Sequence, residues 1–380
     1  MYVNISRSMR SCLLALLAPL FITACNSSDS ASSGNGDLAS GYDSGEVTLL
    51  VTDAPSSEFD EVNVITDSMS LVGEGSEVHL LKKRSKIKLL DLRNSFARLS
   101  RKRVPVGTYH KFRMSVVGVE LIKRHWDKDG NMVEEKIIPK LEQKFFDLNL
   151  AAQMAVHRRS RHMMKLDVDA EQSVHQDQAS STGYTFRTWA RCDVARLPDE
   201  PVDEPAQDPA PEPVPVLMNE KGVARNVLTD SFELCDPADL SVCEQVNMGA
   251  NTVFMDSMVQ VADASSITEN TQLQVIGLLD VNSGAINALH VVEDSSRLNS
   301  YSGGFAGTVS NDAIDFTVTA GTSTGTYPMR PASLPGVYDS AGNVLDINAL
   351  GDGVNAEVIG LLNTFPAFEL RPAVVIIATP

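Results

Sequence analysis

An internal repeat in the second half of this 380-residue sequence constrains its fold more than any other feature. Two blocks recur after about 80 residues: residues 222–234 as residues 304–316, and residues 275–279 as residues 358–362. The offsets are 82 and 83. Two independent blocks at nearly one offset favour a duplication over the alternative that both segments merely share strand-forming residues. We therefore expect two copies of one small unit in tandem.

Each copy reads as strands and turns. Ile314 and Phe316 alternate with Asp315 and Thr317, which is the period of a half-buried β-strand. A unit of about 80 residues built from short strands suits a small closed or nearly closed β-barrel, which leaves few sheet edges exposed. The sequence predicts two tandem β-barrel-like repeats, over residues 219–300 and 301–380.

Short strands separated by turn signals also fill the first half of the chain. We expect strands over residues 46–52, 62–66, 78–81, 87–90, 105–116 and 184–195. Residues 94–102 read as a short helix or a loop, residues 127–131 as a hairpin tip rather than a calcium loop, and residues 148–165 as ambiguous. This pattern is typical of a β-sandwich, so a mainly β chain with an N-terminal sandwich over residues 45–196 is predicted.

The N-terminus has the pattern of an export signal. An apolar stretch of 11 residues, 12–22, follows Arg7 and Arg10, and it is too short to cross a bilayer as a helix. It ends in Ile22-Thr23-Ala24-Cys25, which resembles a bacterial lipoprotein box. In that interpretation residues 1–24 are removed and Cys25 carries the lipid. The alternative is an ordinary signal peptide with a coincidental cysteine.

By resemblance to enterobacterial sorting rules, Asn26 after the lipidated cysteine favours the outer membrane. The mature chain would then have 356 residues and a formal net charge of −19, against −17 for the whole sequence. Residues 25–44 are rich in Ser, Gly, Asp and Asn and read as a flexible tether. Seven prolines and six acidic residues within 198–216 indicate an extended spacer, so residues 197–218 are expected to be a linker.

Charge is strongly segregated along the chain. Residues 82–165 contain 22 basic and 8 acidic side chains, whereas residues 198–380 contain 5 basic and 25 acidic ones. The densest basic stretch comprises Lys82, Lys83, Arg84, Lys86, Lys88, Arg98, Arg101, Lys102 and Arg103. These residues could bind a polyanion such as an acidic glycan or anionic lipid. Two alternatives remain open: a merely solvated face, or docking against the acidic half of the same chain.

The first half resembles a known family through three short motifs. These are Thr52-Asp53-Ala54-Pro55 after the opening strand, Phe59-Asp60-Glu61-Val62-Asn63-Val64, and Pro105-Val106-Gly107-Thr108-Tyr109. The combination is similar to the bacterial domain of unknown function numbered 4382, over residues 45 to about 195. The resemblance implies an exported, sandwich-like domain without established catalytic residues. The two C-terminal copies resemble a small-barrel family numbered 5666, through strand spacing and the V-x-G-L motif.

Few residues form a pattern with a defined chemistry. Cys235 and Cys243 flank a turn and could close a local disulfide in an oxidising compartment. His157 and His162 lie among arginines, which disfavours zinc, and no catalytic or metal site is predicted. Asp53 could be functional or could fix a turn. No cofactor is expected, although a Gly-rich loop could offer oxygen ligands to a structural Ca²⁺ from Asp339, Asn343, Asp346 and Asp352.

These observations favour a lipid-anchored, non-catalytic protein of the cell envelope, with binding or assembly modules and no specific nucleic-acid partner. Its expected partners are the membrane, through the lipid on Cys25, and a glycan or another polyanion. The alternative is an envelope enzyme that acts on polysaccharide with carboxylates that the sequence cannot pair.

Overall fold

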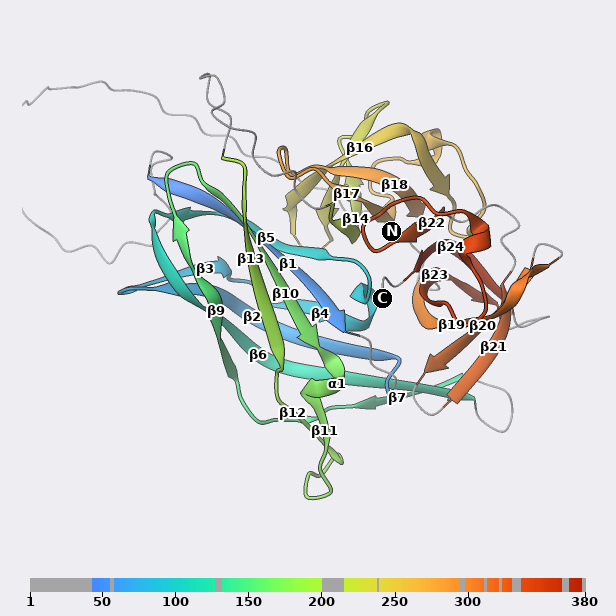
Figure 1. Ribbon diagram of the computed structural model, residues 1–380, viewed down its shortest axis with the longest axis horizontal. Coiled ribbons are helices and arrows are strands. Elements are labelled where there is room, and N and C mark those ends of the chain that lie inside the picture. Colours follow the sequence, from blue (N-terminus) through green and yellow to red (C-terminus); the bar gives the residue numbers. More distant parts are fainter. Residues whose placement is uncertain are drawn as a thin grey trace, which may run out of the picture. The chain divides into compact units, whose positions relative to one another are not determined.

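The computed structural model describes residues 43–54, 58–126, 132–199, 215–237, 239–293, 298–310, 313–320, 323–329, 336–363 and 369–377. Strands make up most of this part of the chain (Figure 1). They form an N-terminal β-sandwich domain and two small barrels. The predicted fold class, a mainly β chain with a sandwich followed by two tandem barrel-like repeats, is confirmed.

The first sheet of the sandwich has the strand order β13-β10-β1-β5. Its strands are β1 (Ser44–Ala54), β5 (Ala97–Pro105), β10 (Arg161–Asp169) and β13 (Ala190–Leu197). Strand β1 is central, antiparallel to β5 and parallel to β10. The first strand in the sequence therefore depends on partners that follow about 50 and 115 residues later.

The second sheet runs β3-β2-β6-β7, with β4 also paired to β2 and β9 to β6. These strands are β2 (Glu61–Gly73), β3 (Ser76–Leu81), β4 (Ser85–Lys88), β6 (Gly107–Trp126), β7 (Met132–Ile137) and β9 (Phe145–Val156). A small third sheet joins β8 (Lys140–Leu141), β12 (Tyr184–Phe186) and β11 (Val174–Gln176). Two short helical turns accompany these sheets: η1 (Leu89–Leu92) and α1 (Ala170–Ser173).

Strand β1 is buried on both faces, which explains its nearly continuous apolar sequence. Val47, Leu49 and Val51 belong to the hydrophobic core of the sandwich. Leu50, on the opposite face, belongs to a second cluster that it shares with Met218 and other residues of the first barrel. The first sheet thus has apolar neighbours on both sides.

The structure corrects three local expectations in the sandwich. The strand expected over residues 184–195 is two strands, β12 (Tyr184–Phe186) and β13 (Ala190–Leu197), with residues 187–189 between them. Residues 94–102 were expected as a short helix or a loop, but residues 97–102 belong to strand β5. The polar side chains of this strand contact the first barrel, so the strand lacks apolar periodicity. The strand expected over residues 87–90 ends at Lys88 and continues as η1. The ambiguous residues 148–165 belong to β9 and β10 with a turn between them. The expected hairpin tip over residues 127–131 lies outside the described residues, although its flanking strands β6 and β7 are antiparallel neighbours.

The first barrel is closed in the order β14-β15-β16-β18-β17. Its elements are β14 (Leu217–Arg225), β15 (Ser231–Asp236), β16 (Asp239–Met255), η2 (Ala264–Ser266), β17 (Gln272–Leu279) and β18 (Ile286–Glu293). Phe232, Val246 and Val275 are among its buried core residues.

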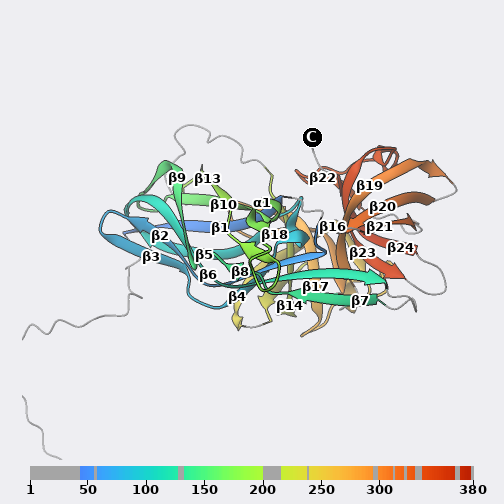
Figure 2. The same ribbon diagram turned by 90° about the horizontal axis from the view of Figure 1, so that it is seen from below.

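The second barrel repeats this topology. Its strands, coloured orange to red, are grouped together at the right of Figure 2. Its elements are β19 (Leu298–Ser310), β20 (Ala313–Ala320), β21 (Ser323–Met329), β22 (Gly336–Asp339), η3 (Ile347–Ala349), β23 (Asn355–Asn363) and β24 (Glu369–Ile377). A parallel pairing of β21 with β24 closes the ring, as the parallel pairing of β16 with β18 closes the first. Strands β21 and β22 together occupy the place of the long β16. Equivalent strands follow the same order in the two copies, as a duplication predicts.

The repeated V-I-G-L-L motif has a steric explanation. Gly277 and Gly360 both lie at a bulge between the last two strands of their barrels. A Cβ atom at position 277 would come within 2.5 Å of the Asn287 carbonyl oxygen, and one at position 360 within 2.3 Å of the Arg371 carbonyl oxygen. Neither backbone approach leaves room for a side chain.

Candidate functional site

The predicted polyanion-binding stretch is partly neutralised by carboxylates of the same chain. Ion pairs join Lys83 to Asp236, Lys86 to Glu120, Lys88 to Glu61 and Arg101 to Glu46. Asp236 lies in the first barrel, and the other three carboxylates lie in the sandwich. The side chains of Lys82, Arg84 and Arg103 are exposed and that of Lys102 is half-buried. The stretch therefore presents less free positive charge than its sequence suggests.

Arg98 extends from β5 into the acidic first barrel. Its side chain is only 4 % exposed; it forms an ion pair with Glu244 and donates a hydrogen bond to the Gly284 carbonyl oxygen at 2.8 Å. Its backbone N–H donates to the Glu220 carboxylate. Burial raises the pKa of both carboxyls, and the Glu244 charge raises the pKa of Glu220 further. One guanidinium thus lies beside two half-buried acids that hold their protons more tightly than usual.

The backbone beside Arg98 also joins the sandwich to this barrel. The Phe96 N–H donates to the Leu217 carbonyl at 2.9 Å, and the Asn219 N–H donates to the Phe96 carbonyl at 2.9 Å. Met163 and Leu197 of the first sheet belong to the same hydrophobic cluster as the barrel core. In these contacts the basic domain docks against the acidic half of the chain. This is one of the alternatives that the sequence left open.

A buried carboxylate marks the contact with the second barrel. Glu357 on β23 is fully buried and accepts hydrogen bonds from the Ser300 hydroxyl at 2.7 Å and the Asn94 N–H at 3.1 Å. Burial raises the pKa of Glu357 to about 7, although the hydrogen bond from Ser300 and the charge of Arg93 oppose this shift. In the first barrel the equivalent residue is Gln274, whose amide donates to the Asn219 oxygen at 2.7 Å.

Asp53 ends β1 in a buried position. One carboxylate oxygen accepts a hydrogen bond from the Ala170 N–H at 3.0 Å, at the start of α1. Burial raises the pKa of this carboxyl well above its ordinary value. The hydrogen bond ties the end of β1 to the end of its neighbour β10. It is a structural contact with a distant segment, and not the bond to nearby backbone amides that the sequence offered for this residue.

A groove on the sandwich domain forms the candidate binding site. It has a volume of about 1070 Å³. Its lining comes from β6, the start of β9, the α1–β11 segment and the β12–β13 connection: Arg113, Gln143, Phe145, Phe146, Asp147, Leu148, Gln172, His175, Arg187, Thr188, Trp189 and Ala190. Along β9, Phe145 and Asp147 are exposed while Phe146 and Leu148 are half-buried. The alternation of this strand therefore turns Phe145 and Asp147 outward.

Asp147 is the one carboxylate among the residues that line the groove. Arg113 holds it with two hydrogen bonds, of 2.7 and 2.9 Å, and Lys111 adds a third at 3.2 Å. The bonds from Arg113 are the largest influence on the pKa of Asp147, which is lowered to about 2. Asp147 is thus ionised at neutral pH, anchors Arg113 and is poorly suited to donate a proton.

Two further cationic or titratable side chains of the groove, Arg187 and His175, are exposed. None of the ion pairs described in this part of the chain engages the guanidinium of Arg187. The sequence did not single out this groove, because its residues come from four separate segments. The available sequence signal was the alternation of apolar and polar residues over 146–150, which predicts a strand with Asp147 on its polar face.

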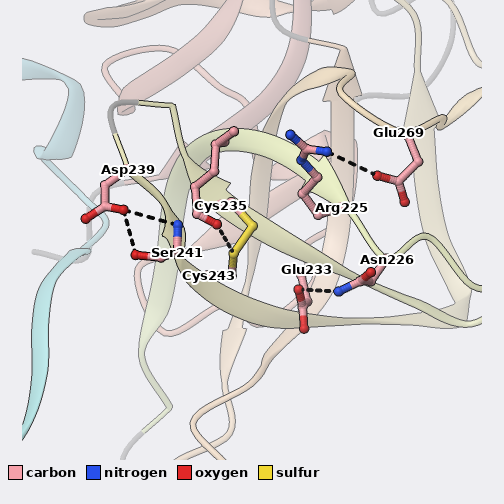
Figure 3. Close-up of a disulfide and its surroundings, with 9 residues drawn as sticks. Arg225, Asn226, Glu233, Cys235, Asp239, Ser241, Cys243 and Glu269 are labelled. Atoms are coloured by element: carbon pink, nitrogen blue, oxygen red, sulfur yellow. Dashed lines mark hydrogen bonds and ion pairs between the residues drawn. A yellow bond between two sulfur atoms is a disulfide. The ribbon is translucent and has the colours of Figure 1, made fainter. Parts of the chain in front are cut away.

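The predicted cysteine pair is joined in the structure. Cys235 on β15 and Cys243 on β16 are opposite each other in an antiparallel pair and form a disulfide (Figure 3). Glu233 lies close enough for its carboxylate to be within 4.8 Å of both sulfurs, but it accepts a hydrogen bond from Asn226 at 2.7 Å. A disulfide leaves no thiolate for a metal. Cys192 is a buried free thiol, and burial raises its pKa to about 12.

The four residues considered for Ca²⁺ bind protein groups. Asp339 accepts from the Ala341 and Asn343 N–H groups at 2.9 Å, Asp346 from the Asn348 N–H at 2.8 Å, and Asp352 from the Gly307 N–H at 3.2 Å. Asp256 and Asp263, at the equivalent positions of the first barrel, bind the same kind of backbone groups. The repetition indicates a turn motif of the fold.

Comparison with protein families supports the resemblance that the sequence shows for the N-terminal domain. Residues 44–188 match the family model of a domain of unknown function, DUF4382. The match ends just before Trp189 and β13, so it covers most of the sandwich and nearly all of the groove. No match to a curated protein was found for this chain.

Cys25 lies outside the described residues. None of the helices in the described part of the chain has the length and apolar character that a membrane crossing requires.

Proposed function

We propose that this chain is a lipid-anchored protein of the bacterial cell envelope that binds its ligand without chemical conversion. The observation that carries the binding role is the groove of the sandwich domain, which combines exposed aromatic side chains with cationic ones. Pockets that combine a few polar groups with aromatic walls are the common form of ligand sites. The basic stretch around β4 and β5 contributes less, because its own chain binds part of it.

The second candidate is an envelope enzyme that acts on polysaccharide. Glycoside hydrolysis uses two carboxyl groups about 5–10 Å apart, one of them with a raised pKa. Of the groove residues, only Asp147 carries a carboxylate, and its pKa is lowered. The carboxyls whose pKa is raised, such as Glu220 and Glu357, do not line the groove; they accept hydrogen bonds from the backbone of Arg98 and Asn94. Binding without hydrolysis is therefore the better-supported function.

Anchoring is tested in cells that are labelled with a palmitate analogue. The wild-type chain is expected to take up the label and to fractionate with the outer membrane. The Cys25→Ala variant is expected to remain unlabelled and to leave the membrane fraction. A wild-type chain without label, or a Cys25→Ala variant that stays membrane-bound, would overturn the lipid anchor.

Binding is tested with the chain from residue 26, which lacks the signal and the acylated cysteine, on an array of envelope glycans and polyanions. We expect retention of at least one ligand class without release of smaller products. Loss of retention in Trp189→Ala would assign the binding to the groove. Product release that survives this substitution would favour the enzyme.

A further inference from the structure

Two exposed aromatic side chains distinguish the groove from the rest of the sandwich surface. Phe145 is 63 % exposed and Trp189 is 48 % exposed, and both line the groove. Single exposed apolar residues are ordinary on a protein surface, but two aromatic rings in one concave site offer flat apolar faces to a ligand. Pyranose rings have such complementary flat, weakly polar faces.

The polar lining defines the charge of the ligand. Arg187 and His175 are exposed in the groove, whereas Arg113 is held by Asp147. A guanidinium can bind a carboxylate through two parallel hydrogen bonds. Gln143 and Thr188 add an amide and a hydroxyl group that both donate and accept, which suits sugar hydroxyls. The amide of Gln172 already donates to Asp169 at 2.7 Å.

We propose that the groove binds an acidic saccharide, a chain of pyranose rings that bear carboxylates. Trp189 and Phe145 stack on the rings, and Arg187 binds a carboxylate. The volume of about 1070 Å³ is at the upper end of ordinary ligand pockets, so more than one ring can be accommodated. This inference rests on the proposed binding function and specifies its ligand.

A single-stranded nucleic acid would use the same aromatic rings, but it needs a groove that follows the phosphates with many cations. Here two arginines line the groove and one of them already binds Asp147. The formal charge of the whole chain is −17, which repels a polyanion of high charge density. Carboxylates spaced one per sugar fit the observed lining better.

The experiment measures binding of the chain from residue 26 to a hexamer of galacturonate, a neutral glucose hexamer and a ten-nucleotide oligothymidylate, by calorimetry. Trp189→Ala is expected to weaken binding of the acidic hexamer by about tenfold or more, as for a central aromatic contact. Arg187→Gln is expected to weaken it by about fivefold while it leaves the weaker binding of the neutral hexamer unchanged. Leu228→Ala and Arg158→Gln, at exposed sites away from the groove lining, are matched controls without effect.

Each outcome separates the ligand from the proposed function. If the chain binds the acidic and the neutral hexamer equally well, and Trp189→Ala but not Arg187→Gln abolishes this binding, the binding function stands and the acidic specificity is overturned. Preference for the oligothymidylate would overturn the saccharide. If binding of the acidic hexamer persists in both groove variants but disappears in the double variant Lys82→Gln/Arg84→Gln, the site lies on the basic stretch and the groove is not the binding site. Absence of binding to all three probes would overturn this inference, while the palmitate experiment still tests anchoring.

Discussion

At the residue level, the second barrel buries a carboxylate where the first barrel buries an amide. Glu357 and Gln274 lie at equivalent positions, and each hydrogen-bonds a polar residue of the neighbouring strand of its own barrel, Ser300 or Asn219. Only the carboxylate also accepts from the backbone of the sandwich, at Asn94. This difference makes the contact with the second barrel sensitive to protonation.

Replacement of Glu357 should change how stability depends on pH. The pKa of this carboxyl is about 7 in the folded chain and near 4.5 when unfolded, so the folded state binds the proton more tightly. The wild type therefore loses stability as pH rises from about 4.5 to 7. Relative to the wild type, the free energy of unfolding of Glu357→Gln should rise by up to about 3 kcal/mol between pH 4.5 and 8, measured by urea titration.

The first barrel provides the reciprocal control. Gln274→Glu should introduce a buried acid and lose stability over the same pH range, because its new carboxyl must ionise away from water. If the difference between Glu357→Gln and the wild type were the same at pH 5 and pH 8, the protonation of Glu357 would not be linked to folding.

Arg98 offers a second prediction at this level. Its removal leaves Glu244 and Glu220 without their nearest buried cation, and an uncompensated buried charge is costly. Arg98→Leu is expected to lower the free energy of unfolding by about 3 kcal/mol, and a second change, Glu244→Gln, should recover part of the loss. Arg84→Leu, at an exposed site of the same stretch, should have little effect. Equal losses in the two arginine variants would show that the ion pair contributes nothing specific.

At the element level, the glycine bulges allow the last two strands of each barrel to approach closely. Gly277→Ala is expected to destabilise the chain by about 1–3 kcal/mol, because its Cβ would meet the backbone of β18. Gly249→Ala, on β16 of the same barrel, has only the Thr252 hydroxyl at 4.0 Å near its Cβ and should be close to neutral. Thermal unfolding of both variants tests this, and a stable Gly277→Ala chain would contradict the steric explanation.

The elements also show what the sequence could and could not predict. The barrels were predicted because their signals depend on packing within one barrel. The alternation around Ile314 and Phe316 indicates a half-buried strand, and the repeated V-I-G-L-L motif marks a close approach of two strands. Strand β5 was missed because its polar side chains contact residues far along the chain: Arg98 forms an ion pair with Glu244, and Arg101 donates to the Ser283 carbonyl oxygen, both more than 100 positions away. The groove was also missed, because Arg113, Phe145 and Trp189 come from separate segments and no local sequence pattern brings them together.

At the level of the whole molecule, the sandwich and the barrels are joined by more than the chain that connects them. Leu50 and Met163 share a hydrophobic cluster with the first barrel, Phe96 pairs with its strand β14, and Asn94 donates to Glu357 of the second barrel. Together with the ion pair of Arg98 with Glu244, these contacts combine apolar burial, backbone hydrogen bonds and opposite charges. The joined halves should therefore resist separation even without a covalent link.

This expectation is tested by placing a specific protease site within residues 200–214 and cutting the purified chain there. The two fragments are expected to elute together in gel filtration at micromolar concentration, because the contacts on both sides of the cut remain. The Arg98→Leu variant, treated in the same way, should dissociate more readily. Separation of the wild-type fragments after cleavage would show that the contacts are weak and that the spacer alone keeps the halves together.

The position of β1 in its sheet has a kinetic consequence. A chain that emerges N-terminus first presents β1 early, yet its two neighbours, β5 and β10, end at Pro105 and Asp169. Pairings of such large sequence separation form slowly, and until then an apolar strand is left with both edges open. The time between the appearance of β1 and of β10 is therefore the period in which this chain is most exposed to aggregation and most in need of a holding chaperone.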